Sequence, residues 1–237
     1  MTLPPFHWWR TVFFLIPVIT VYTIIMGSIS LLSTLVDRSG YTAHRCAQFW
    51  TRIILLTTGV RVDVRGTLPP VGTSYVFASN HQSIYDVPVI FATLPHQLRI
   101  IAKASLGSFP FLGWHLRLSG HLLVDREHPG ATVFKKMQRM ISQGASLILF
   151  PEGTRSDDGR VGRFKGGVFL LAIESGLPIV PISVSGSRNV MRKGRLMTCP
   201  GDVTLTVHDP ISTAGLTRED ARALAARVQA VVAGGVS

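Results

Sequence analysis

The feature that most limits how this chain can fold is a long uncharged segment near its start. Thr11–Val36 contains no Asp, Glu, Lys or Arg over 26 positions. As an α-helix it would be about 39 Å long, more than the roughly 30 Å hydrocarbon core of a bilayer. Trp8 and Trp9 precede it, as aromatic residues do at a membrane interface. We expect a retained membrane helix; the alternative is a buried helix of a soluble core.

A second, amphipathic helix is expected over Tyr41–Thr58. Its apolar face consists of Ala47, Trp50, Ile53 and Ile54. Arg45, Gln48 and Arg52 are expected to lie elsewhere on the helix, away from this face. Residues 1–58 are therefore predicted to form a membrane-associated two-helix element. Because most Lys and Arg residues follow the apolar segment, the rest of the chain is expected on the cytoplasmic side of the membrane.

The composition combines an apolar chain with a surplus of positive charge. Hydrophobic residues make up 46% of the 237 residues and charged residues only 16%, yet the net charge is +11. This combination suits a surface that faces anionic lipid headgroups. Nucleic acid is not expected as a partner, because the basic residues are scattered among apolar segments. The two cysteines and eight histidines show no metal-ligand spacing, so no metal site is predicted.

From residue 59 onward, short apolar runs alternate with helical patterns. Strands are expected over Val60–Arg65, Tyr75–Ala78, Leu98–Ala102, His121–Val124, Ser146–Phe150, Ile179–Val184 and Val203–Val207. Helices are expected from about Asp86 to Leu94 and over Ala131–Ser142, Lys165–Ser175 and Thr217–Val232, the last with a capping box. The alternation predicts an α/β domain over residues 59–237, with a mostly parallel sheet flanked by helices.

The segment Asn80–Asp86, with the sequence NHQSIYD, directly follows the expected strand Tyr75–Ala78. A carboxylate beside an imidazole is the minimal apparatus for general-base catalysis. Residues five positions apart do not face each other on a straight helix, so His81 and Asp86 meet only if the backbone turns between them. Pro88 predicts a helix that starts near Asp86. The alternative is a helix-capping aspartate beside a solvated histidine.

Other polar residues also follow apolar strands: Lys103, Asp125, Arg126 and Phe150–Ser156. In open α/β sheets, ligands bind in the crevice outside the carboxyl ends of the strands. These residues are therefore expected near His81 and Asp86, in one cationic pocket. A lone basic residue at any one of these positions is more commonly a solvated surface charge.

The stretch Phe150–Ser156, with the sequence FPEGTRS, is suited to binding a phosphate. Gly153 allows a close approach of the backbone, Thr154 offers a hydroxyl, and Arg155 can donate two parallel charge-assisted hydrogen bonds. Glu152 is out of place beside an anion unless it pairs with a base or shapes the loop. The alternative is an ordinary loop with Arg155 in solvent.

The sequence resembles the glycerolipid acyltransferase family, and within it the 1-acyl-sn-glycerol-3-phosphate acyltransferases. Four ordered blocks carry the resemblance: NHxxxxD at Asn80–Asp86, a Gly to Asp-Arg segment at Gly120–Arg126, FPEGTRS at Phe150–Ser156, and an apolar strand with an internal proline at Ile179–Val184. The blocks cover about residues 60–190. NHxxxxD alone is a weak signal, whereas NHxxxxD followed by FPEGTRS at this separation is a strong one.

The resemblance implies a role for each candidate residue. His81 would be the general base on the acceptor hydroxyl, and Asp86 would orient it. The acceptor phosphate would be bound by Lys103, Arg126, Gly153, Thr154 and Arg155. Glu152 would support this phosphate site.

The resemblance also implies a reaction. An acyl group would pass from acyl-CoA or acyl carrier protein to the sn-2 hydroxyl of 1-acyl-sn-glycerol-3-phosphate, making phosphatidic acid at a membrane without a cofactor. Two alternatives stay open. One is the same chemistry on another lysolipid, such as a lyso-ornithine lipid. The other is a basic protein that binds acidic lipids at a membrane surface and catalyses nothing.

Overall fold

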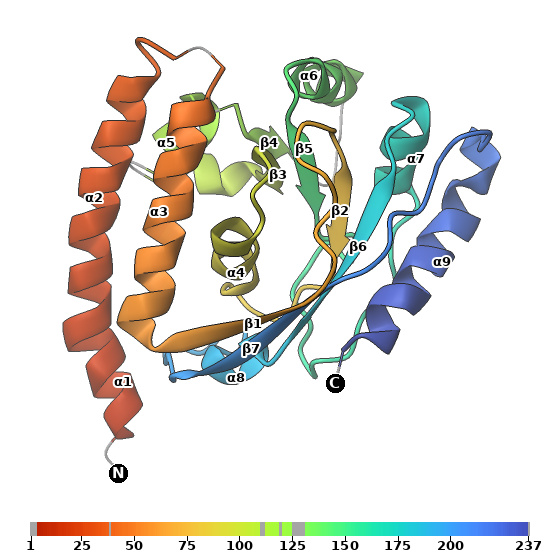
Figure 1. Ribbon diagram of the computed structural model, residues 1–237. Helices are drawn as coiled ribbons and strands as arrows, with labels where there is room; N and C mark the ends of the chain where they lie inside the picture. The colour runs from red at the N-terminus through yellow and green to blue at the C-terminus, as the bar shows by residue number, and fades with distance from the viewer. Residues whose placement is uncertain (1–3, 38, 110–111, 119, 125–130, 237) are drawn as a thin grey trace.

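A seven-stranded sheet forms the centre of the molecule (Figure 1). The computed structural model describes the chain apart from residues 1–3, 38, 110–111, 119, 125–130 and 237. The order of the strands across the sheet is β1-β7-β6-β2-β5-β3-β4. Their bounds are β1 Val60–Gly66, β2 Val76–Ser79, β3 Leu98–Lys103, β4 Leu122–Val124, β5 Ser146–Leu149, β6 Ile179–Ser185 and β7 Gly201–Val207.

The sheet is mostly parallel, as predicted. β6, β2, β5, β3 and β4 run in one direction. β7 is antiparallel to β6, with Ile182 opposite Val207, and the edge strand β1 is parallel to β7. The carboxyl ends of β2 and β5 therefore lie side by side, at the edge of the sheet where α/β proteins bind ligands.

The helices cover both faces of the sheet (Figure 1). They are α1 Phe6–Arg10, α2 Ile16–Ser33, α3 Tyr41–Thr58, α4 Asp86–Thr93, α5 Leu112–Leu118, α6 Ala131–Ser142, α7 Gly167–Glu174, α8 Ser187–Val190 and α9 Ala221–Gly234. A π-helical turn, η1 Thr11–Leu15, joins α1 to α2, and two 3-10 turns are η2 Ala104–Ser108 and η3 Arg218–Asp220. The predicted capping box at Thr217 and Asp220 is present.

The predicted helices agree with the structure except in details. α7 begins at Gly167 rather than at Lys165, and the backbone N–H of Lys165 donates to Pro151 O at 3.1 Å. η2, α5 and α8 were not predicted. They span at most seven residues, which is too short for a period of 3.6 residues to show in a sequence.

Successive residues of the central strands point to opposite faces of the sheet and enter two separate cores. In β6, Val180 and Ile182 join a core shared with α3 and α4. Ile179 joins the other core, which α7 and α9 cover. The sheet is thus buried on both faces, and this explains why its central strands are continuous apolar runs.

The N-terminal helical run Phe6–Ser33 carries most of its apolar surface outward. Within the described residues, it is the one helix long and apolar enough to cross a membrane. Only 11% of its most apolar window is buried, whereas the core helix of a soluble protein is mostly buried. This exposure indicates association with a membrane. Pro17 lies just after the π turn, whose wider ring makes room where proline has no N–H to donate.

The buried face of α3 differs from the prediction. α3 packs between α2 and α4 (Figure 1). Gln48 is buried, and its side-chain amide donates to Leu94 O at 2.9 Å. The prediction that Gln48 lies away from the packed face was wrong, because the last carbonyls of a helix such as α4 need donors and a buried amide supplies one.

Arg99 of β3 joins the two N-terminal helices to the sheet. It is buried, and its guanidinium donates to Ser39 O at 3.1 Å and Gly40 O at 3.3 Å in the connection between α2 and α3. A third bond goes to Leu98 O at 3.1 Å. Burial lowers the pKa of Arg99 to about 10.

We expect Arg99→Ala to lower the free energy of unfolding by about 2–4 kcal/mol, because it leaves buried carbonyl groups without donors. Thermal unfolding in detergent measures this effect. Arg61→Ala is the control, because the ion pair of Arg61 with Asp202 lies in solvent and exposed pairs contribute little. Equal losses in the two variants would contradict the role of Arg99.

Candidate active site

His81 and Asp86 meet across the turn that joins β2 to α4. β2 ends at Ser79 and α4 begins at Asp86, and His81 Nδ1 lies 2.7 Å from Asp86 Oδ2. The expected turn of the backbone between the two residues is therefore present. Because a carboxylate can only accept, Nδ1 carries the proton and Nε2 holds the free lone pair. The pair has the arrangement of a general base and the group that orients it.

The turn is built around the carboxylate of Asp86, which is fully buried. Its Oδ2 atom also accepts the backbone N–H groups of Gln82, at 2.7 Å, and Ser83, at 2.9 Å. Its Oδ1 atom accepts the hydroxyl of Ser187. A buried carboxylate is stable only with such donors, so the aspartate and the turn hold each other in place.

The imidazole of His81 lies against the ring of Phe150, with the ring centroids 4.1 Å apart and the planes inclined by 25°. Its side chain is only 16% exposed. The backbone carbonyl of His81 accepts the N–H of Ser156 at 2.7 Å. The first and third sequence blocks thus contact each other at both side chain and backbone, as their positions after neighbouring strands predict.

Glu152 supports His81 through the backbone. The N–H of His81 donates to Glu152 Oε1 at 2.8 Å, and the N–H of Gly162 donates to Oε2 at 3.0 Å. Burial raises the pKa of Glu152, and the two backbone N–H groups oppose that rise. The sequence left open whether Glu152 pairs with a base or shapes the loop. These two hydrogen bonds to backbone N–H groups show that it shapes the loop.

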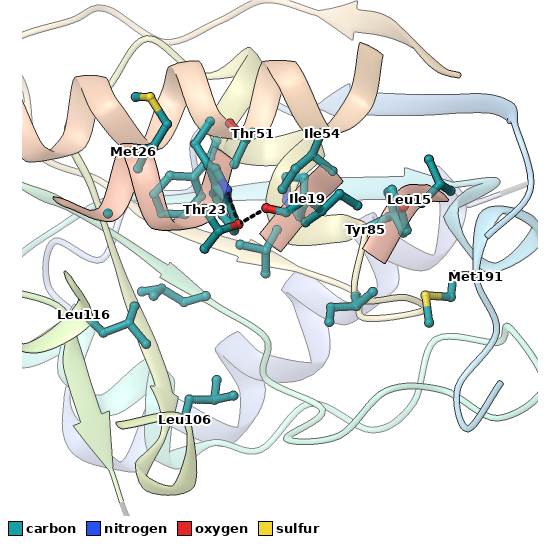
Figure 2. A pocket seen from close by; sticks show the side chains of 18 of the residues that line it. Leu15, Ile19, Thr23, Met26, Thr51, Ile54, Tyr85, Leu106, Leu116 and Met191 are labelled. Atoms are coloured by element: carbon teal, nitrogen blue, oxygen red, sulfur yellow. Dashed lines mark hydrogen bonds between the residues drawn. The ribbon is translucent and has the colours of Figure 1, made fainter. Parts of the chain in front are cut away.

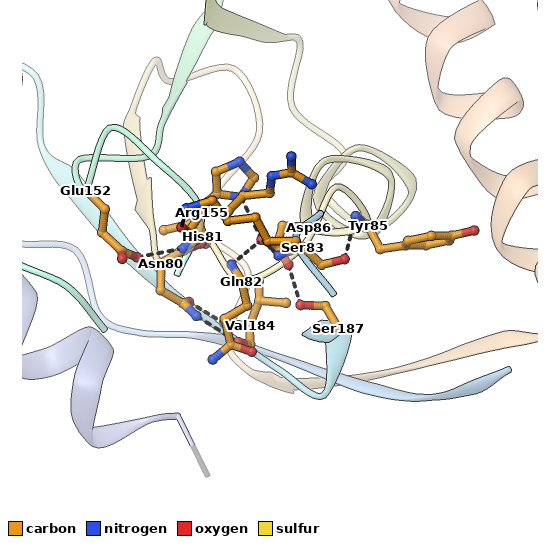
Figure 3. A network of polar contacts seen from close by, with 12 residues as sticks. Asn80, His81, Gln82, Ser83, Tyr85, Asp86, Glu152, Arg155, Val184 and Ser187 are labelled. Carbon is orange, nitrogen blue, oxygen red and sulfur yellow. Dashed lines mark hydrogen bonds and ion pairs between the residues drawn. The ribbon is translucent and has the colours of Figure 1, made fainter. Parts of the chain in front are cut away.

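The remaining residues of FPEGTRS form a turn beside this pair. Gly153 has a φ of +78°, and a Cβ there would lie 3.0 Å from Lys165 Nζ. Thr154 is exposed and Arg155 half-buried. In Figure 3 the guanidinium of Arg155 and the imidazole of His81 extend to the same side of the network, opposite Val184 and Ser187. Lys193 Nζ donates to Arg155 O at 3.0 Å and holds this turn.

The other two predicted phosphate ligands are only partly described. Lys103 is the last residue of β3, next to β5 in the sheet, and its backbone alone is described. Arg126 and its neighbour Asp125 lie outside the described residues. The structure thus brings together His81, Asp86 and the segment with Glu152 and Arg155.

An apolar pocket of about 410 Å³ lies beside the His81–Asp86 turn, between α2, α3 and the start of α4 (Figure 2). Ile84 and Tyr85 of the turn line it, together with Leu15, Ile19, Met26, Ile54, Leu106 and Leu116. The indole N–H of Trp50 donates to Thr23 Oγ1 at 2.9 Å, which satisfies two polar groups of the wall. Burial raises the pKa of Tyr85. The pocket can hold a long apolar chain.

Sequence reasoning did not assign several residues that complete the site. Asn80 makes two hydrogen bonds with the backbone of Val184, at 2.9 and 2.8 Å, and so extends β2 along β6. Lys165, Lys193 and Ser187 reach the site from distant segments. Among these residues, only Asn80 had a local signal, because it belongs to the block NHxxxxD.

The fold and this site define a class of enzymes, and comparison with known proteins identifies it. The family model described as "Acyltransferase" matches residues 61–185, a range that contains His81, Asp86 and the segment FPEGTRS. The chain therefore belongs to the acyltransferase family.

Named relatives share much of the chain. It is 35% identical over 186 residues to the chloroplastic 1-acyl-sn-glycerol-3-phosphate acyltransferase BAT2 of Brassica napus and 37% identical over 180 residues to 1-acyl-sn-glycerol-3-phosphate acyltransferase alpha of Mus musculus. These alignments cover 76% and 72% of this chain, but only 54% and 62% of the relatives. The chain thus spans between half and two thirds of their length.

A solved structure with the same fold is the 1-acyl-sn-glycerophosphate acyltransferase PlsC from Thermotoga maritima. The TM-score is 0.79 at 26% sequence identity, and the match covers 97% of this chain and 92% of that one. The likeness therefore includes the N-terminal helices as well as the sheet.

The raised pKa of Glu152 predicts how stability depends on pH. Between the ordinary pKa of a glutamate, about 4.3, and the raised value, the folded state binds more protons than the unfolded state, so stability falls as the pH rises. In Glu152→Gln this contribution is missing. We expect the stability of the wild type relative to Glu152→Gln to be greatest at low pH and to decrease through that window. Thermal unfolding of both proteins from acid to neutral pH measures it, and a difference that grows with pH would contradict it.

Proposed function

We propose that this chain transfers an acyl group from an acyl thioester to the sn-2 hydroxyl of 1-acyl-sn-glycerol-3-phosphate and so makes phosphatidic acid. The observation that carries the proposal is the hydrogen bond between His81 and Asp86, which leaves a basic nitrogen free next to the FPEGTRS turn. Relatives named for this reaction support the choice of substrate.

The chemistry assigned to His81 is proton removal. The acceptor hydroxyl is a poor nucleophile, and His81 Nε2 takes its proton as the oxygen attacks the thioester carbonyl. The ester C–O bond forms, the C–S bond breaks, and the proton passes to the departing thiolate. Asp86 keeps the imidazole in the correct tautomer and stabilises the imidazolium. A positioned base of this kind contributes about 10²–10⁴-fold in rate.

The phosphate of the acceptor is assigned to the FPEGTRS segment together with two basic residues from other segments. In this proposal the ligands are Lys103, Arg126, Gly153, Thr154 and Arg155, with Glu152 holding the loop behind them. The ammonium group of Lys165, which lies over Gly153, adds a further positive charge at this turn. Binding the phosphate remote from the reacting hydroxyl turns binding energy into orientation at the reacting centre.

The apolar parts of the substrates and of the membrane are assigned to the N-terminal half of the structure. The pocket between α2, α3 and α4 takes an acyl chain, because its lining is apolar and Ile84 and Tyr85 form part of its wall. These two residues belong to the turn from His81 to Asp86, which we call the catalytic turn. Residues 1–58 hold the acyltransferase domain, residues 59–237, on the cytoplasmic side of the membrane. The donor is acyl-CoA or acyl carrier protein, and both deliver the same thioester.

The direct test is to incubate the purified protein with candidate lysolipids and both donors and to identify the products by mass. Phosphatidic acid as the main product is expected. A product made from lyso-ornithine lipid or from another phosphate-free acceptor, with none from 1-acyl-sn-glycerol-3-phosphate, would contradict the proposed acceptor.

His81→Ala should lower kcat by about 10²–10⁴-fold and leave membrane binding intact, because only the base is lost. Turnover at saturating substrate and co-sedimentation with vesicles measure the two properties. His208→Ala is the matched control, since His208 hydrogen-bonds Ser183 at 2.8 Å and does not belong to the site. Unchanged turnover in His81→Ala would exclude His81 as the base and would favour a protein that only binds lipid.

Arg155→Ala should raise the KM for the lysophospholipid about 10- to 100-fold and leave the KM for the donor within about twofold, because it removes charge-assisted bonds to the phosphate. Steady-state kinetics with each substrate varied in turn measure this. Arg61→Ala serves as a remote control. An unaltered acceptor KM would remove Arg155 from the phosphate site.

A further inference from the structure

We propose that Ser187 is a positioning residue for acyl transfer: its hydroxyl orients the carboxylate of Asp86 so that Oδ2 faces His81. The inference rests on the proposed function, and it adds a residue from a segment outside the two catalytic blocks. Figure 3 shows Ser187 on the opposite side of Asp86 from the imidazole.

The division of donors between the two carboxylate oxygens carries the inference. Asp86 Oδ2 accepts from three groups: His81 Nδ1, the N–H of Gln82 and the N–H of Ser83. Asp86 Oδ1 accepts from Ser187 Oγ at 2.5 Å. Both Asp86 and Ser187 are fully buried among the described residues, so solvent water does not reach Oδ1 to take the place of the Ser187 hydroxyl.

The loss of this hydroxyl would leave Oδ1 buried without its donor. A buried acceptor without a donor is costly, and the carboxylate of Asp86 would then be free to rotate about its Cβ–Cγ bond, away from the orientation that suits the three donors of the turn. Both the direction of the His81 hydrogen bond and the position of the negative charge relative to the imidazolium depend on that rotation. The hydroxyl of Ser187 therefore sets a geometry on which the chemical step depends.

The backbone places Ser187 for this contact. β6 ends at Ser185, and Gly186 then adopts a φ of +87°, where a Cβ would lie 2.4 Å from Asp202 O. Only glycine fits such a turn, which directs Ser187 and α8 back under the catalytic turn. The hydrogen bonds of Asn80 to Val184 align the ends of β2 and β6.

A second bond strengthens this junction. The hydroxyl of Ser83 donates to Met191 O at 2.7 Å, just beyond the end of α8. The segment from Ser187 to Met191 thus contacts the catalytic turn at two points. Of these two hydrogen bonds, only the one from Ser187 is made to the His81–Asp86 pair, so a change at Ser187 acts directly on Asp86.

The experiment compares Ser187→Ala with Ser183→Ala in the whole 237-residue chain, using the acyl thioester that supports turnover of the wild type. Ser183 is the matched control. It is a buried serine of the neighbouring strand β6, and its hydroxyl donates to Val232 O at 2.7 Å on the other face of the sheet. Melting temperatures of both variants show whether they lose similar stability.

We expect Ser187→Ala to lower kcat about 10- to 100-fold with either KM changed less than about twofold, whereas Ser183→Ala keeps kcat within about twofold. Ser187→Cys, which retains a weak donor of similar size, should lie between the wild type and Ser187→Ala. This variant is also the test if the alanine protein does not fold. Equal kcat values for Ser187→Ala and Ser183→Ala, or a cysteine variant with full kcat, would overturn the inference.

A double-mutant cycle tests whether Ser187 acts through Asp86. In the Asp86→Ala protein, adding Ser187→Ala should change the residual rate less than about twofold. A full additional loss there would overturn the inference while the proposed function stands. Absence of acyl transfer in the wild type would overturn the proposed function itself, and this inference with it.

Discussion

The carboxylate of Asp86 is fully buried, and a buried carboxylate is tolerated only when its hydrogen bonds are complete. Its four donors come from His81, from two backbone amides of the same turn and from Ser187 beyond β6. The short distance between a histidine and an aspartate five positions apart follows from this requirement. The turn between β2 and α4 folds around the charge, and the end of β6 closes it. The geometry of the His81–Asp86 pair and the stability of the junction therefore have the same physical cause.

The carboxylates of Asp86 and Glu152 contact different parts of His81. Asp86 orients the side chain of His81, whereas Glu152 accepts its backbone N–H and also the N–H of Gly162. Such a division keeps the negative charge of Glu152 turned toward backbone N–H groups. It explains how a glutamate can stand inside a motif suited to an anion. Burial disfavours the charged form of Glu152, and this raises the pKa of its carboxyl group.

Much of the site was predictable because its residues follow apolar strands. His81 comes after β2 and Glu152 after β5, so the local pattern placed each at a strand end, and the parallel pairing of the two strands puts both ends at one edge. Ser187, Lys165 and Lys193 were not predictable in the same way. A serine at a strand end or a lysine before a helix has the same local sequence whether it faces a catalytic group or solvent. Gln48 was misplaced for a similar reason, since periodicity counts its polarity but not the carbonyl of Leu94 that it satisfies.

By itself, the sequence determined the classes of structure: an N-terminal apolar helix, an alternation of strands and helices, and two motifs whose residue types suit a base and a phosphate. These follow from local chemistry, because periodicity, turn residues and strand ends depend on neighbours in the chain. Only the tertiary structure decided which hydroxyl meets the buried carboxylate, which lysine lies over Gly153, and how α2, α3 and the catalytic turn enclose an apolar pocket. Those contacts join segments far apart in the chain, and packing rather than local preference selects them.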